Sequence, residues 1–123
     1  MIIFIPGEFT TANEYIEAER SNRYAGAEIK KCETYRAKLA GRDVKQVQYY
    51  PVDLYFTWYR RDRKRDPDNC AFSIKFILDG LVKAGVLKAD GWNQIRSIHH
   101  EFVVDKNNLG VEIRIMEIDE EAG

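Results

Sequence analysis

The clearest pattern in the chain is a strict alternation of apolar and polar positions between Pro51 and Arg61. One face of this segment carries the large apolar side chains of Val52, Leu54, Phe56 and Trp58. A period of two residues predicts a half-buried strand. The apolar run at residues 1–5 predicts a buried strand, and residues 95–104 and 111–118 predict two more strands. The Asn- and Gly-containing segment 105–110 predicts a hairpin turn between those last two strands.

Helical spacing is present in two segments. Between residues 27 and 39, an apolar face of Cys32, Tyr35 and Leu39 predicts a helix that stops at Gly41. Residues 70–84 are rich in Phe, Ile and Leu and predict a largely buried helix that ends before Gly85. The polar stretch 7–23 is typical of a loop or a mobile arm. The resulting order predicts an α+β domain, with a mixed or mostly antiparallel sheet packed against helices.

Composition limits the classes of protein to which the chain can belong. With 123 residues, of which 45% are hydrophobic, it fits a single domain over residues 1–123, in which 117–123 form a frayed acidic tail. The formal net charge of −1 excludes a uniformly basic nucleic-acid-binding surface. Any nucleic-acid contact must therefore come from local segregation of charge. The stretch 60–65 shows such segregation, because it holds five basic residues and one acid.

Two further features indicate the cellular setting. The opening apolar run has no preceding basic segment and is stopped by Pro6, so it is too short for a signal peptide or a membrane span. Cys32 and Cys70 lie far apart without a CxxC spacing, which indicates reduced, structural cysteines. Both observations favour a cytoplasmic protein with no membrane contact.

Candidate chemistry begins where the basic stretch runs into closely spaced carboxylates. The basic residues are Arg60, Arg61, Arg63, Lys64 and Arg65, and Asp66 and Asp68 follow them directly. Basic side chains bind phosphodiesters, and carboxylates bind the hard cations that help to cleave them. The stretch therefore predicts a metal-dependent site on a polyanion. The structural alternative is a solvated loop that leads into a helix start.

Helical geometry extends the candidate site. In a continuous helix, offsets of 7 and 11 residues return to within about 20° of the starting direction, so Asp68, Lys75 and Asp79 would share one face. Each residue also has a structural interpretation. Lys75 and Asp79 can form an i,i+4 ion pair, Asp68 or Asn69 can cap the helix, and Asp90 can shape the turn before Gly91.

The order of these residues carries a family resemblance. The run Arg65-Asp66-Pro67-Asp68-Asn69, followed by Lys75, Asp79-Gly80-Leu81, Ala84-Gly85 and Asp90, resembles the core motif of the RusA family of Holliday junction resolvases. The resemblance covers roughly residues 60–95. It implies a small homodimeric endonuclease of phage or prophage type, which resolves four-way DNA junctions by paired symmetric nicks in recombination and repair, with Mg²⁺ as cofactor and Mn²⁺ as a possible substitute.

The resemblance also implies residue roles. Asp66, Asp68 and Asp90 match the catalytic metal-binding carboxylates, and Lys75 matches an essential lysine that neutralises the transition state or protonates the leaving 3′ oxygen. The five basic residues of the stretch 60–65 would bind DNA. Two departures from the family pattern are visible. The gap from Asn69 to Lys75 is three residues longer, and Ala89 stands where the family often has a second aspartate.

Other interpretations remain open at the level of sequence. The chain could be a non-catalytic protein that binds DNA junctions, or a metal-dependent nuclease for flaps or other branched nucleic acid. Tyr55, Tyr59 and Trp92 could stack on unpaired bases or serve in packing. His99 and His100 are adjacent on a predicted strand, so they should point to opposite faces and form no shared site.

Overall fold

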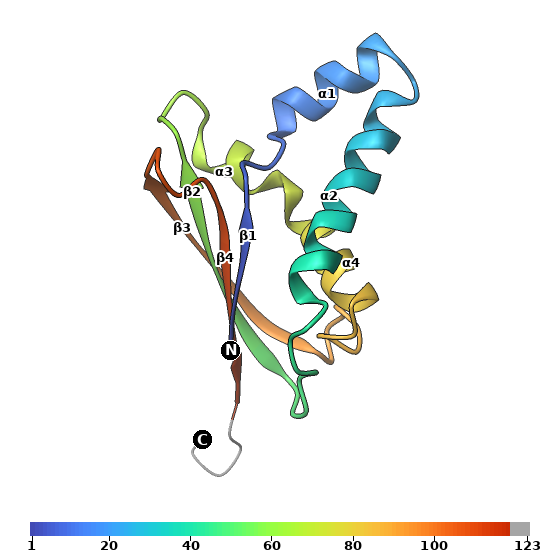
Figure 1. Ribbon diagram of the computed structural model, residues 1–123, viewed down its shortest axis with the longest axis vertical. Helices are drawn as coiled ribbons and strands as arrows, with labels where there is room; N and C mark the ends of the chain where they lie inside the picture. Colours follow the sequence, from blue (N-terminus) through green and yellow to red (C-terminus); the bar gives the residue numbers. More distant parts are fainter. Residues whose placement is uncertain (119–123) are drawn as a thin grey trace.

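The protein is a four-stranded mixed sheet with its helices on one face, as seen in the computed structural model, which describes residues 1–118 (Figure 1). The elements in chain order are β1 (Ile2–Pro6), α1 (Ala12–Ser21), α2 (Ala25–Gly41), β2 (Val52–Arg60), α3 (Pro67–Cys70), a 3₁₀ turn (Ala71–Ser73), α4 (Ile74–Lys83), β3 (Ile95–Val104) and β4 (Gly110–Glu117). The predicted α+β class with a mixed sheet is confirmed. None of the described helices combines the length and the apolar character needed to cross a bilayer.

The strand order is β1-β4-β2-β3, with β2 near the centre. The pairs β1–β4 and β2–β4 are antiparallel, and β2–β3 is parallel. The predicted hairpin over residues 105–110 is wrong, because β2 lies between β3 and β4. The connection instead crosses the end of β2, where the Asp105 amide donates a hydrogen bond to the Arg60 carbonyl.

The core lies between the sheet and the helices. The alternation predicted for β2 is confirmed, since Val52, Leu54, Phe56 and Trp58 are each at most 1% exposed. They pack in one cluster with Ile77 and Leu81 of α4 and with apolar side chains of β1 and β4. The N-terminal strand is less buried than predicted, because Ile2 and Phe4 point to the face without helices and are 60% and 42% exposed.

The segment predicted as a loop over residues 7–23 contains helix α1. Thr11 accepts a hydrogen bond from the Glu14 amide, and the Glu14 side chain accepts one from the Thr11 amide, which makes a capping box. None of the residues of α1 is buried. The sequence analysis missed this helix, and the Thr11–Glu14 capping box is a local signal that could have revealed it.

Helix α2 is confirmed, but its predicted buried face is wrong. Cys32 is exposed, and Tyr35 and Leu39 are 57% and 42% exposed. The buried side is instead formed by Gly26, Glu33, Thr34, Ala37 and Gly41. Gly80 of α4 allows the two helices to approach closely, since a Cβ at this position would lie only 2.4 Å from the Thr34 carbonyl oxygen of α2.

The predicted acidic tail begins later than expected. Glu117 is the last residue of β4, and its Oε1 accepts a hydrogen bond of 3.1 Å from the Gln48 amide. The remaining acidic residues of the predicted tail, Asp119, Glu120 and Glu121, lie outside the described residues.

Candidate active site

The predicted helix over residues 70–84 is interrupted. The four-residue helix α3 passes into a 3₁₀ turn before α4 starts at Ile74. A 3₁₀ helix turns by about 120° per residue and an α-helix by about 100°, so three 3₁₀ residues rotate the following helix by about 60°. The assumption that placed Asp68 on one face with Lys75 and Asp79 is therefore wrong, although Lys75 and Asp79 do share a face of α4.

A buried carboxylate explains the interruption. The Ser73 hydroxyl lies 2.6 Å from Oε1 of Glu33 and 2.7 Å from the Thr10 carbonyl oxygen. Oε2 of Glu33 accepts a hydrogen bond of 2.8 Å from the Thr10 amide. Glu33 is 5% exposed and Ser73 is 0% exposed. This network ties the 3₁₀ turn to α2 and to the segment before α1. Sequence reasoning missed it, because its members lie 23 and 40 residues apart.

Asp66 and Asp68 stand at the start of α3. Asp66 is the N-cap residue, with an extended backbone and Pro67 as the first helical residue, but its side chain makes no capping hydrogen bond. Asp68 follows in the first turn. Both residues are exposed, and neither takes part in an ion pair within residues 1–118. Their carboxylates are therefore accessible to a ligand.

Asn69 has a structural role that differs from the predicted cap. Its Oδ1 accepts a hydrogen bond of 2.9 Å from the amide of Asn13, in the first turn of α1. An amide in the first turn of a helix has no partner within the helix. Asn69 therefore satisfies a donor of the neighbouring helix and holds α3 against α1.

Lys75 joins the two other acidic positions of the motif. Its Nζ lies 2.9 Å from Oδ1 of Asp79 and 3.3 Å from Oδ2 of Asp90. The i,i+4 pair is confirmed, and the contact with Asp90 bridges 15 residues of sequence. The Lys75 side chain is 65% exposed, whereas those of Asp79 and Asp90 are 26% and 28% exposed. The two carboxylates thus hold an ammonium group that remains open to solvent.

The charge state of this lysine follows from its partners. The hydrogen bond to Asp79, followed by the one to Asp90, raises the pKa of Lys75 above its ordinary value. A raised pKa favours the ammonium form. Of the two roles implied for Lys75, charge neutralisation therefore fits better than proton donation.

Asp90 and Asp66 lie near opposite ends of β3. A pocket that contains Asp90 touches β3 at residues 95–98, and a second pocket of about 290 Å³ that contains Asp66 touches it at 102–104. At about 3.3 Å per residue, Ser97 and Val103 are separated by about 20 Å. Within residues 1–118 there is no group of three or more His, Cys, Asp or Glu side chains that could hold a metal ion. Asp66, Asp68 and Asp90 are thus not gathered into one carboxylate cluster within the described residues, and their joint role as Mg²⁺ ligands stays a prediction.

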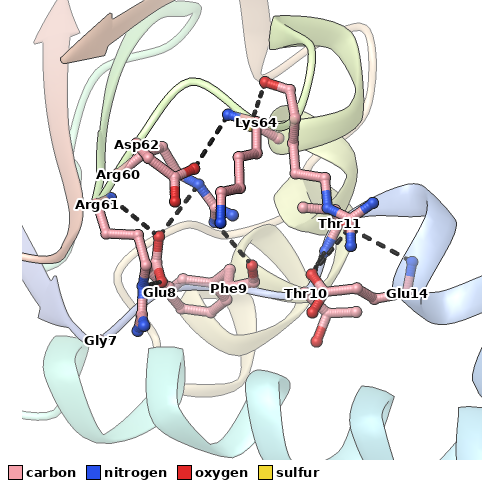
Figure 2. A network of polar contacts seen from close by, with 12 residues as sticks. Gly7, Glu8, Phe9, Thr10, Thr11, Glu14, Arg60, Arg61, Asp62 and Lys64 are labelled. Atoms are coloured by element: carbon pink, nitrogen blue, oxygen red, sulfur yellow. Dashed lines mark hydrogen bonds and ion pairs between the residues drawn. The ribbon is translucent and has the colours of Figure 1, made fainter. Parts of the chain in front are cut away.

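The predicted DNA-binding residues divide into two groups. Arg60 is 13% exposed at its side chain, its Nε lies 3.3 Å from Oε2 of Glu8, and its Nη1 donates to the Phe9 carbonyl at 3.1 Å (Figure 2). Arg61 lies 2.6 Å from Oε1 of the same carboxylate. These two arginines fasten the segment after β1 to the end of β2.

The other predicted DNA-binding residues, Arg63, Lys64 and Arg65, are exposed. None of them takes part in an ion pair within the described chain. They, rather than Arg60, present free positive charge next to Asp66.

The remaining candidates are the two adjacent histidines and the aromatic residues that could stack on bases. His100 Nδ1 accepts a hydrogen bond of 2.9 Å from Trp58 Nε1 on the helix side, and the His99 ring stacks on Tyr55 on the other face with 4.5 Å between ring centroids, so the two histidines point to opposite faces, as predicted. Tyr59 packs edge-on against Phe4. Trp92, beside Asp90, is 98% exposed and is the candidate most available for base stacking.

Comparison with known proteins adds no family assignment. A scan against protein-family models found no match, and a search of curated proteins also found none.

Proposed function

We propose that this protein is a structure-specific endodeoxyribonuclease that resolves Holliday junctions by paired nicks. The observation that supports the proposal is the Lys75 cluster. The motif positions Lys75, Asp79 and Asp90 come from two separate segments and meet at hydrogen-bond distance, with the ammonium group exposed. An exposed ammonium group held by two carboxylates suits charge stabilisation at a phosphodiester, and the basic loop near the other end of β3 offers side chains that bind phosphates.

The proposed roles rest on the side chains of this chain. Arg63, Lys64 and Arg65 bind backbone phosphates and set the position of the DNA, without reading its sequence. Lys75 stabilises the negative charge that develops on the scissile phosphate. Asp79 and Asp90 keep Lys75 protonated and oriented. In the proposed homodimer, two such sites would match the two-fold symmetry of a four-way junction.

The dependence on Mg²⁺ or Mn²⁺ remains a prediction from the family resemblance. Within residues 1–118 Asp90 lies apart from Asp66 and the three predicted carboxylates form no common cluster, so we assign no catalytic step to a bound metal. The cleavage assay tests this dependence directly.

The test is cleavage of a labelled four-way junction, a flap and a linear duplex of matched sequence, with and without Mg²⁺. The proposal predicts symmetric nicks in the junction alone, and the family resemblance, which makes Asp68 a metal-binding carboxylate, predicts their loss in Asp68→Asn. Asp43→Asn changes an exposed aspartate outside the site and should cleave normally. Equal cleavage of flaps and junctions would indicate a nuclease for branched nucleic acid in general.

A second candidate is a non-catalytic protein that binds DNA junctions. The observation in its favour is that Asp90 pairs with Lys75 and does not join Asp66 and Asp68. This candidate predicts junction binding without cleavage under any divalent metal, and binding that is unchanged in Asp68→Asn. Cleavage by the wild-type protein that Asp68→Asn abolishes would exclude it.

A further inference from the structure

A second basic surface lies on the helical layer, outside the motif. It is a groove of about 360 Å³ between α2 and α4, which lie side by side in Figure 1. The groove is lined by Ala27, Lys30, Lys31, Thr34, Tyr35, Lys38 and Lys83. Six of these residues recur at helical spacing along α2, and Lys83 ends α4. The sequence analysis did not single out this stripe, because the lysines are spaced among other residues.

The positive charge of the groove is not neutralised locally. The four lysines are exposed, and none of them forms an ion pair within residues 1–118. Four ammonium groups beside one groove repel each other unless an anion lies between them. The groove is therefore electrostatically suited to a negatively charged ligand.

Thr34 provides an independent sign of a ligand. It is only 7% exposed and lines the groove, and its hydroxyl oxygen is buried without a hydrogen-bond partner. It is the one side chain with a buried, unsatisfied polar atom in the described part of the chain. A hydroxyl in this state loses free energy relative to water unless a ligand completes its hydrogen bond.

The dimensions of the stripe favour an extended ligand. Lys30 and Lys38 are eight residues apart on α2, which corresponds to about 12 Å along the helix axis. One DNA strand advances about 3.4 Å per phosphate along its axis, so the stripe matches about three phosphates. A single free phosphate is much shorter than the stripe, whereas a strand with successive phosphates can follow its whole length.

We propose that the groove between α2 and α4 binds the phosphate backbone of a nucleic acid, as a contact surface separate from the basic loop. The lysines contact successive phosphates, and a rotation of the Thr34 side chain brings its buried, unpaired hydroxyl to a phosphate oxygen, to which it then donates a hydrogen bond. The choice of a nucleic acid over a free phosphate compound rests on the proposed function. A free phosphate or diphosphate shares the same chemistry and is distinguished by the experiment.

The experiment measures fluorescence anisotropy of a labelled duplex and of a four-way junction in EDTA, over a series of salt concentrations. We expect Lys31→Gln/Lys38→Gln to weaken binding at least 10-fold. The slope of log K against log salt should fall by about 1.8, which is about 0.9 for each phosphate that is no longer neutralised. The matched control Lys45→Gln/Lys106→Gln removes the same charge outside the groove and should change the slope by less than half of that.

Thr34→Val tests the hydroxyl without changing the charge. Valine has nearly the same shape, and the hydroxyl that it replaces has no partner in the free protein. We therefore expect weaker binding, by about 5-fold, together with an unchanged or slightly higher melting temperature. A loss of melting temperature without a change in binding would show that the hydroxyl serves the fold, and would overturn this part of the proposal.

Titration with inorganic phosphate and with diphosphate, followed by NMR shifts of the Thr34 and Lys38 amides, distinguishes the ligand sources. Saturation below 1 mM, with DNA affinity unchanged in the lysine variants, would identify a small phosphate ligand and overturn the nucleic-acid proposal. The two proposals can fail separately. If the wild-type protein does not cleave junctions but the lysine variants bind DNA more weakly, only the nuclease proposal is refuted. If the wild-type protein cleaves junctions and the lysine variants bind DNA normally, only the groove proposal is refuted.

Discussion

Arg60 and Lys75 are cations that the sequence analysis assigned to one candidate site, and their ion pairs differ in the folded protein. At the end of β2, Arg60 and Glu8 pair with side chains that are 13% and 16% exposed. On α4, Lys75 is 65% exposed although it touches two carboxylates. Burial thus separates an ion pair that holds chain segments together from one whose charge remains available to a ligand.

The difference has a physical basis. A charge that is removed from water needs its partner, because losing that partner leaves a desolvated charge uncompensated. An exposed pair gains little from its attraction, because water screens it and the side chains lose conformational freedom. The Arg60 cluster should therefore govern stability, and the Lys75 cluster should govern activity.

The largest effect on stability is expected for Glu8→Ala. It removes the partner of Arg60 and should lower the free energy of unfolding by about 3 kcal/mol, measured by urea denaturation. Asp43→Ala is the matched control, since its pair with Arg42 is 91% exposed at the aspartate and should contribute less than about 1 kcal/mol. Equal effects of the two substitutions would contradict the assignment of Arg60 to the fold.

The opposite pattern is expected for Lys75→Gln. Junction cleavage should fall by about 100-fold or more, because the variant cannot stabilise the charge of the transition state. The free energy of unfolding should change by less than about 1 kcal/mol. Lys88→Gln removes another exposed lysine that follows α4 and should leave cleavage unchanged. A Lys75 variant that loses stability and keeps its activity would place Lys75 in the same class as Arg60.

The contrast also shows which parts of the structure the sequence could predict. Local patterns were sufficient for β2, because its apolar positions alternate and all face one core. They were sufficient for the Lys75–Asp79 pair as well, because four residues make about one turn of a helix. Features that depend on periodicity within one element are therefore accessible from the sequence.

Long-range polar contacts were not accessible in the same way. Ser73 interrupts the predicted helix because it is held by Glu33, 40 residues away. Arg60 was assigned to DNA binding because it belongs to the basic stretch. Its partner Glu8 was not recognised, because it lies 52 residues earlier and outside the motif. Asp90 was selected as a candidate only from its place in the order of motif residues. That order did not reveal how far Asp90 lies from Asp66 in the fold.

The smallest effect is expected from Asp79→Asn, which tests whether Asp79 positions Lys75. The carboxylate raises the pKa of Lys75, so its removal should lower that pKa towards the ordinary value, measured by NMR titration of the lysine side chain. Because the folded pKa is raised, the stabilisation by this pair is present below the ordinary lysine pKa of about 10.4 and is lost as the pH rises through the higher folded value.

Wild-type stability should therefore fall slightly more than that of Asp79→Asn above pH 10, and the two should run parallel between pH 6 and 9. Cleavage by Asp79→Asn should decrease less than that by Lys75→Gln, since Asp90 still holds the ammonium group. An unchanged Lys75 pKa together with lost cleavage would indicate that Asp79 contacts the substrate or a metal ion itself. Asp79 would then act in the reaction directly and not through Lys75.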